Sequence, residues 1–184
     1  PAIELSGISS DSRNLEQGDL FIAYQGKTSH GLEFLDQAVV AKVAAVVFDS
    51  STGQAPSADI PIVPVADLAR QLGTIANRFF DTPSRRVKVS GVTGTNGKTT
   101  VAYLIMQCLH LLGHKCAYIG TLGSGIDEIS ITDGMTTPAC IDLHRQLANF
   151  HDAGARHAAI EVSSHALEQN RVDGVYFDTA IFTN

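Results

Sequence analysis

The chain has 184 residues, of which 44% are hydrophobic and 17% are charged, and its formal net charge is −6. This length allows one large or two small domains, each with its own core, and the composition is that of an ordinary globular protein. A pI near 5.5 excludes a broad basic surface for nucleic acid or an anionic membrane. The sequence has neither a membrane-length apolar run nor a basic, apolar leader, so we expect a cytoplasmic protein.

Residues 1 to 83 predict a small α/β domain. Helical patterns cover residues 33–40 and about 67–80, and Asp67 is suited to cap the second helix. The turn-forming residues 81–84 end that helix, so we place the domain boundary between residues 83 and 84. Three apolar segments of this domain have the pattern of strands: 19–25, 44–48 and 61–65.

From residue 87 the pattern alternates between strands and helices, which predicts a mainly parallel sheet with ligands at the carboxyl ends of its strands. Helices are expected at 100–112 and from Thr137, as N-cap, to about 153. The sequence stops at Asn184, directly after a strand, so we expect the chain to be a fragment. The segments with strand patterns, the last two expected to be buried, are 87–92, 115–120, 158–162 and 177–182.

Three cysteines, Cys108, Cys116 and Cys140, are odd in number and lack the Cys-x-x-Cys spacing. Their number and spacing argue against a disulfide framework and against a zinc site. Cys108 shares a helical spacing with Leu104 and Leu112, so we expect it to be a small buried hydrophobic side chain.

The sequence GVTGTNGKTT at 91–100 joins a predicted strand to a predicted helix, the context of a phosphate-binding loop. Gly94 and Gly97 allow backbone N–H groups to converge on phosphate oxygens at a helix N-terminus. Lys98 adds a positive charge, and Thr99 places a hydroxyl for Mg²⁺. The strict pattern G-x-x-x-x-G-K-[ST] would need glycine where Val92 stands. A chance Gly-Lys-Thr is the alternative, but the flanking strand and helix favour phosphate binding.

A second polar motif, EVSSHALEQNR at 161–171, follows another apolar strand. Glu161 could be a ligand for the Mg²⁺ near the glycine-rich loop, because hard cations take oxygen ligands. Alternatively, Ser163 or Ser164 caps a short helix and Glu161 is merely solvated. A nucleophilic Ser-His pair is a third reading, but the G-x-S-x-G elbow is missing.

These two motifs, with TTP at 136–138 and SSDSRNLEQGDLFIAYQG at 9–26, resemble the Mur ligases of peptidoglycan synthesis over the whole chain. The resemblance implies an α/β fold: an N-terminal uridine-binding domain, 1–83, and an incomplete P-loop-type, mainly parallel ATP-binding sheet, 84–184. It also implies ATP-dependent addition of a third amino acid to UDP-N-acetylmuramoyl-L-alanyl-D-glutamate through an acyl phosphate. Gln169 and Arg171 favour meso-diaminopimelate as that amino acid.

Two alternatives to this function stay open: a lysine-adding homologue, and a nucleotide-dependent switch or binding module. The resemblance implies ATP and Mg²⁺ as cofactors, and a UDP-N-acetylmuramoyl dipeptide and a diamino acid as partners. We expect a monomer that binds neither nucleic acid nor membrane. Members of this family continue into further metal-supporting residues and a C-terminal domain, so we expect the isolated 184 residues to lack ligase activity.

The resemblance also implies roles for individual residues. Lys98 and Glu161 would be catalytic, and Thr99 and Glu161 would hold the metal. ATP would be bound by Gly94, Thr95, Asn96, Gly97, Lys98, Thr99 and Thr100. The UDP end of the substrate would be contacted by Ser10, Ser12, Lys27, Thr28 and Ser29. The muramoyl dipeptide would be contacted by Thr136, Thr137, Ser163, Gln169 and Arg171.

Each of these polar residues has a simpler structural alternative. Ser10 and Ser12 could be turn residues, and residues 27–29 could be a solvated loop. Thr137 could serve only as a helix cap. His165 receives no catalytic role, and a structural hydrogen bond is the expectation for it.

Overall fold

The computed structural model describes residues 3–26, 29–52, 56–131 and 134–184. The chain divides into two compact units, the first ending at Leu72 and the second running from Gly73 to Asn184. This division falls inside a helix, and the domain boundary expected at residues 83 and 84 remains a prediction. None of the helices within the described ranges is both long and apolar enough to cross a membrane.

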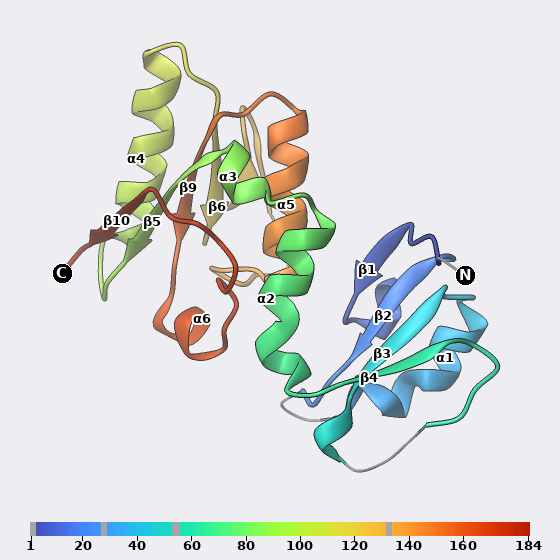
Figure 1. Ribbon diagram of the computed structural model, residues 1–184. Helices are drawn as coiled ribbons and strands as arrows, with labels where there is room; N and C mark the ends of the chain where they lie inside the picture. The colour runs from blue at the N-terminus through green and yellow to red at the C-terminus, as the bar shows by residue number, and fades with distance from the viewer. Residues whose placement is uncertain (1–2, 27–28, 53–55, 132–133) are drawn as a thin grey trace. The chain divides into compact units, whose positions relative to one another are not determined.

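The first unit contains a four-stranded parallel sheet in the order β1-β2-β3-β4 (Figure 1). Phe21, Val46 and Phe48 form its core together with Ala38 from α1. The predicted strands and the helix at 33–40 are confirmed, whereas β1 was not predicted. The strands are β1 (Gly7–Ser9), β2 (Asp19–Ala23), β3 (Ala45–Asp49) and β4 (Ile62–Val65). The helices are α1 (Leu35–Val40) and three short 3₁₀ segments, Ser12–Asn14, Gly31–Phe34 and Ser50–Thr52.

The first N–H group of helix α2 (Leu68–Phe79) is hydrogen-bonded to a side chain of the first sheet. The Asp49 carboxylate at the end of β3 accepts the N–H of Leu68 at 3.1 Å. Asp67, the predicted N-cap, has a left-handed backbone with φ of 50°. A carboxylate distant in sequence therefore provides a side-chain acceptor at this helix start.

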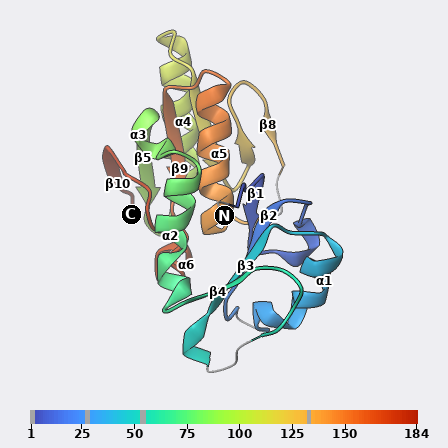
Figure 2. The same cartoon turned by 45° about the vertical axis from the view of Figure 1, so that its right-hand side comes forward.

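The second unit contains a six-stranded sheet in the order β10-β5-β9-β6-β7-β8. β10, β5, β9 and β6 are parallel, and β7 and β8 add an antiparallel hairpin that was not predicted. Figure 2 shows β10 and β8 at opposite edges of this unit. The strands are β5 (Lys88–Thr93), β6 (Cys116–Gly120), β7 (Gly123–Gly125), β8 (Ile129–Ser130), β9 (His157–Glu161) and β10 (Thr179–Phe182). The helices are α3 (Pro83–Arg86), α4 (Lys98–Leu111), α5 (Cys140–Asp152) and α6 (Ser164–Glu168).

Two crossovers in opposite directions place α4 and α5 on opposite faces of the second sheet (Figure 1). α4 connects β5 to β6 past β9, and after the hairpin of β7 and β8 the chain returns through α5 to β9. Side chains alternate accordingly: Tyr118 packs with Met106 of α4, whereas Ile119 packs with Leu143 of α5. The face of β9 that is covered by α4 therefore also carries Glu161.

The buried face of α4 differs from the prediction. Cys108 is exposed, and so are Leu104 and Leu112, whereas Ala102 and Met106 face the sheet. The helix is apolar almost all around, so spacing alone could not select its buried face. The expected burial of strand 177–182 is also wrong: β10 is an edge strand of the described sheet, and Phe182 is 81% exposed.

Candidate nucleotide and metal site

The glycine-rich loop follows β5 and ends at the first residue of α4. Gly94 and Gly97 have φ angles of 132° and 83°, a region that L side chains rarely adopt. A Cβ atom at Gly94 would also overlap the carbonyl and hydroxyl oxygens of Thr183. Glycine is therefore required at this turn, as predicted. Val92 lies two residues before Gly94, within β5, and is buried between the sheet and α4.

The loop directs two consecutive backbone N–H groups toward one oxygen atom. Thr95 and Asn96 both donate to the main-chain oxygen of Asn184, at 2.7 Å and 3.2 Å. Lys98 turns back over the loop, and its Nζ donates to the carbonyl oxygens of Gly94 at 2.7 Å and Thr95 at 3.1 Å. This convergence of donors at a helix N-terminus is the geometry that anion binding requires.

Glu161 lies at the carboxyl end of β9 and is 0% exposed. Its Oε1 accepts the Tyr118 hydroxyl and, at 2.9 Å, the N–H of Thr121. Its Oε2 accepts the Thr99 hydroxyl at 2.8 Å and the Thr121 hydroxyl at 3.2 Å. The alternative of a solvated Glu161 is wrong, because the carboxylate is buried and fully hydrogen-bonded.

Strand order explains how these groups meet. β6 lies beside β9 with Ile119 opposite Ile160, which brings the end of β6 next to Glu161. A Cβ atom at Gly120 would overlap both Glu161 Oε1 and the Tyr118 hydroxyl. Gly120 is therefore the residue that lets tyrosine and carboxylate approach across the strand end.

The electrostatics favour tyrosine as a donor. Burial, followed by the hydrogen bond to Glu161, raises the pKa of Tyr118 well above its usual value. The phenol therefore stays protonated at neutral pH and donates to the carboxylate. Sequence reasoning missed Tyr118 and Thr121, although strand 115–120 was predicted to end at the same edge of the sheet as Glu161.

The TTP segment joins this site through both of its threonines. The Thr136 hydroxyl lies 3.1 Å from that of Thr121. Thr137 is buried; its hydroxyl donates to the Glu161 carbonyl at 2.7 Å and accepts the Ser163 N–H at 3.2 Å. The expected capping role of Thr137 is wrong, because α5 starts at Cys140 with Ala139 as N-cap. Thr137 instead fixes the backbone just after β9.

The residues after Glu161 also hold one another. The Ser163 hydroxyl accepts the Ala166 N–H at 3.1 Å, so the capping role considered for Ser163 is confirmed. Arg171 donates to the Thr137 carbonyl at 2.9 Å and to Gln169 Oε1 at 2.7 Å. Arg171 therefore ties the second motif to the TTP segment.

His165 lies on α6 with an exposed side chain, and the expected structural hydrogen bond is not found among the described residues. Its imidazole therefore does not help to hold the second motif together. The Ser-His nucleophile considered from the sequence also lacks support, because the Ser163 hydroxyl is engaged with Ala166.

The predicted UDP contacts belong to the first unit. Ser10 is partly buried, and Ser29 is partly buried with its carbonyl accepting the Gly26 N–H at 3.0 Å. Lys27 and Thr28 lie outside the described residues. Ser12 lines a cavity of about 360 Å³ together with residues of the α1 region: Asp36, Gln37, Val40 and Ala41.

The donor set at the carboxyl end of the second sheet fits a magnesium ion. No group of three or more His, Cys, Asp or Glu side chains within the described ranges could hold a metal. Mg²⁺ is commonly held by one or two carboxylates together with substrate phosphates and water. Glu161 Oε2 and the hydroxyls of Thr99 and Thr121 supply oxygen donors of that kind at one point.

A parallel sheet with a glycine-rich loop that leads into a helix at its carboxyl edge defines a P-loop-type nucleotide-binding protein. Comparison with known families is more specific. A family model described as "Mur ligase middle domain" matches residues 92–184, and one described as "Mur ligase family, catalytic domain" matches residues 4–80. The chain belongs to the Mur ligase family.

Individual relatives agree with this assignment. The UDP-N-acetylmuramoyl-L-alanyl-D-glutamate--2,6-diaminopimelate ligase of Xanthomonas campestris pv. campestris (strain 8004) is 44% identical over 186 residues, covering 99% of this chain and 37% of the relative. A solved structure with the same protein name has a TM-score of 0.82 at 29% identity, covering 98% of this chain and 36% of that one. The chain thus spans a little over a third of the length of these relatives.

A more distant solved structure shares the fold. MurF ligase from Thermotoga maritima in complex with ADP has a TM-score of 0.58 at 20% identity, covering 89% of this chain and 33% of that one. The predicted α/β class with parallel sheets is confirmed by these matches and by the strand topology.

Proposed function

We propose that this chain is the nucleotide- and substrate-binding part of an ATP-dependent ligase. The reaction adds meso-diaminopimelate to UDP-N-acetylmuramoyl-L-alanyl-D-glutamate during cytoplasmic peptidoglycan synthesis. The observation that carries the proposal is the 2.8 Å hydrogen bond from Thr99, in the first turn after the glycine-rich loop, to buried Glu161. The names of the relatives supply the substrate, and they favour diaminopimelate over lysine.

The loop would bind the phosphates of ATP. The N–H groups of Thr95 and Asn96 already converge on an oxygen, and a phosphate oxygen is a stronger acceptor of the same kind. Lys98 would exchange its two loop carbonyls for the transferring phosphoryl group and neutralise charge there. The remaining predicted contacts to ATP would come from Gly94, Gly97 and Thr100, which lie in the loop and at the start of α4.

Thr99 and Glu161 would hold Mg²⁺, and Thr121 would orient the Glu161 carboxylate beside it. The ion, when bound, would supply positive charge against the phosphate oxygens. Glu161 keeps its position without the ion because Tyr118 and the Thr121 N–H hold the other oxygen, Oε1. The site is therefore preorganised for the metal.

The reaction needs the D-glutamate side-chain carboxylate to attack the γ-phosphorus of ATP, with ADP as the leaving group. The amine of the incoming amino acid then attacks the acyl carbon, phosphate leaves with the bonding electrons, and a proton is lost from nitrogen. Lys98 and the loop N–H groups act in the first step, where negative charge is shared between two phosphates.

The muramoyl dipeptide would lie against the TTP segment and the second motif, near Thr136, Gln169 and Arg171. Arg171 would offer its planar guanidinium to a substrate carboxylate. Thr137 and Ser163 would contribute through the backbone they fix, at the end of β9. The UDP end would be bound by the first unit, through Ser10, Ser12, Lys27, Thr28 and Ser29.

The test is phosphate release by the full-length protein that contains this chain, with ATP, the UDP-muramoyl dipeptide and diaminopimelate all present. Lys98→Ala should lower turnover by at least about 100-fold, because a preorganised cation at the transferring phosphate is lost. The exposed Lys115→Ala serves as the matched control and should retain turnover. Unchanged turnover in Lys98→Ala would contradict the proposal, and so would equal turnover with lysine.

A separate calorimetric experiment addresses the substrate. The 184-residue chain should bind the UDP-muramoyl dipeptide, and Ser12→Ala should weaken that binding, whereas a nucleotide-dependent switch would ignore uridine compounds. Light scattering of the same sample should give the mass of a monomer.

A further inference from the structure

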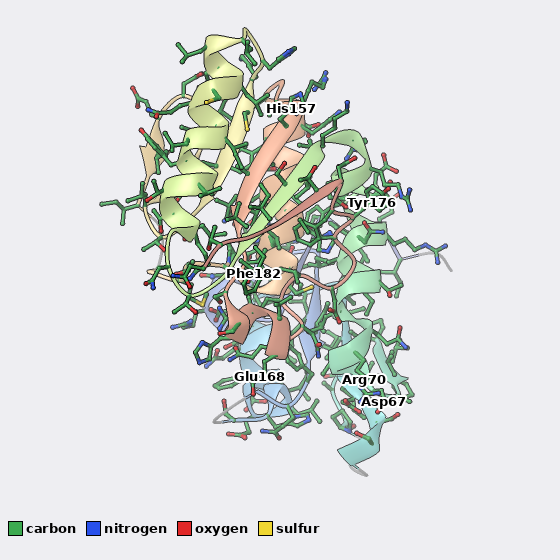
Figure 3. The ribbon with its side chains drawn as sticks, turned by 90° about the vertical axis from the view of Figure 1, so that its left-hand side faces the viewer. Asp67, Arg70, His157, Glu168, Tyr176 and Phe182 are labelled. Atoms are coloured by element: carbon green, nitrogen blue, oxygen red, sulfur yellow. The ribbon has the colours of Figure 1, made fainter. Side chains whose placement is uncertain are left out.

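A second cavity lies at the amino end of the second sheet, opposite the glycine-rich loop. It has a volume of about 380 Å³, within the range of small-molecule sites. Figure 3 shows His157 and Tyr176 at one end of this sheet and Phe182 toward the other. The lining residues come from α3, the starts of β5 and β9, and the segment before β10: Ser84, Arg85, Arg86, Val87, Lys88, Arg156, His157, Tyr176 and Asp178.

The lining is strongly cationic in an acidic chain. Four of the 13 lysines and arginines of the chain line this cavity. Asp178 is the one carboxylate among its lining residues, and its Oδ2 already accepts the Val89 N–H at 2.8 Å. Within the described residues Arg85, Lys88 and Arg156 form no ion pair, so Asp178 is the one acidic side chain in the lining that opposes their charges.

Two of the arginines are held in place before any ligand arrives. The Arg85 guanidinium stacks 4.5 Å from the ring centre of Tyr176. Arg86 donates to the Phe80 carbonyl at 2.9 Å and lies 3.7 Å from the Asp81 carboxylate, but its buried Nε finds no acceptor among the described residues. A buried, unsatisfied guanidinium nitrogen beside a cavity indicates room for an acceptor that the protein does not itself provide.

His157 also lines this cavity, and neighbouring charges affect its pKa. Burial lowers the pKa of His157, as do the neighbouring His114 and Lys88, while Asp178 opposes them. The His114 and His157 rings lie 5.5 Å apart. An anion bound in the cavity would favour the charged imidazole and would therefore raise the pKa of His157.

We propose that this cavity binds a small diphosphate-bearing anion, separate from the ATP site. Guanidinium groups match phosphate oxygens in pairs, and three of the four cations are arginines. The volume admits free pyrophosphate or the diphosphate end of a nucleotide, which share this chemistry. The proposal does not depend on the ligase activity.

The test uses Lys98→Ala in the chain, so that the glycine-rich loop is weakened, and inorganic pyrophosphate as the probe in calorimetry. Adding Arg85→Gln and Arg156→Gln, both at exposed positions, should weaken binding at least tenfold. Arg145→Gln removes one positive charge from α5, away from the cavity lining, and should leave affinity within twofold. Proton NMR of His157 should show its titration midpoint moving to higher pH with pyrophosphate.

Comparison of pyrophosphate with ADP then identifies the source of the diphosphate. Tighter binding of ADP that the arginine changes weaken assigns a nucleotide, and equal binding assigns the free diphosphate. Binding that the arginine changes leave untouched, or a His157 midpoint that pyrophosphate does not move, would overturn the proposal.

Discussion

At the carboxyl end of the second sheet a single carboxylate, Glu161, is completely buried and accepts four hydrogen bonds. At the amino end of the same sheet four cationic side chains line a cavity whose one carboxylate is engaged elsewhere. The first arrangement compensates its charge within the protein, whereas three of the four cations in the second, Arg85, Lys88 and Arg156, form no ion pair among the described residues. Burial decides the difference, because an unpaired charge is tolerable only where water reaches it.

This contrast predicts that changes at the carboxyl end cost folding stability as well as function. Changes at the amino end should cost binding alone. The variants below test the two halves of that statement, beginning with the largest expected effect.

Gly120→Ala should have the largest effect, because its Cβ would overlap Glu161 Oε1 and the Tyr118 hydroxyl. We expect a loss of about 3 kcal/mol in the free energy of unfolding, the upper part of the range for overpacking. Urea denaturation of the chain measures it. Gly113→Ala is the control: it has φ of 81° but open space around it, so it should lose only about 1 kcal/mol from backbone strain. Equal losses in the two variants would show that the strand ends can separate.

Glu161→Gln keeps the size of the side chain but places an NH₂ group against hydroxyl and N–H donors. We expect a loss of about 2 kcal/mol in unfolding free energy, the cost of leaving buried groups unsatisfied. The loss of the carboxylate should also abolish the Mg²⁺ dependence of ATP binding, measured by calorimetry with and without the ion.

Glu168→Gln, on the exposed side of α6, is the matched control for Glu161→Gln. It should change stability by less than about 0.5 kcal/mol and retain the Mg²⁺ dependence. Wild-type stability in Glu161→Gln would mean that the hydrogen bonds around this carboxylate contribute little.

Much of the fold could be predicted because strands such as β3, β6 and β9 are apolar runs between turn-forming residues, the pattern of parallel strands buried on both faces. β1 was missed because three residues carry too little periodicity. The hairpin of β7 and β8 was missed because glycine-containing antiparallel strands do not resemble buried ones. The buried face of α4 was wrong because apolar residues surround that helix.

The residues of the candidate site also include some that could be predicted from the sequence and some that could not. Thr99 and Glu161 were predicted because each stands in a compact motif whose chemistry is local. Tyr118 and Thr121 were not, since they reach Glu161 only through the placement of β6 beside β9. Thr137, Ser163 and Arg171 were predicted to contact the dipeptide. Ser163 and Arg171 also hydrogen-bond to Thr137, which depends on tertiary contacts that the sequence does not reveal.

His144 provides a test of how the burial of a titratable side chain affects folding stability at a position for which no ligand is proposed. It lies on α5 with 0% exposure, and one ring nitrogen, Nε2, contacts the Asp173 carbonyl oxygen at 2.9 Å. Burial lowers the pKa of His144, with the Asp173 carbonyl opposing. The folded state therefore favours neutral imidazole, so its contribution to stability is complete above about pH 6.5 and is lost as pH falls through the folded-state pKa.

We expect the wild type to lose on the order of 1 kcal/mol more than His144→Gln between pH 7 and pH 5. Urea denaturation at a series of pH values measures this difference. His165→Gln, at an exposed position, should follow the wild-type curve. Parallel curves for wild type and His144→Gln would mean that the pKa of this imidazole is the same in the folded and the unfolded state.

The smallest effect on stability is expected at the amino end. Arg85→Gln and Arg156→Gln should each change unfolding free energy by less than about 0.5 kcal/mol, because both side chains are exposed and the stacking of Arg85 on Tyr176 is weak in water. In thermal denaturation without anions the doubly substituted chain should melt within about 2 °C of wild type. Pyrophosphate should then raise the melting temperature of Lys98→Ala more than that of the variant carrying all three changes, because the stabilisation by a ligand falls as its binding weakens. A large loss of stability without anions would place these arginines among the groups that hold the fold together, and the contrast between the two ends would disappear.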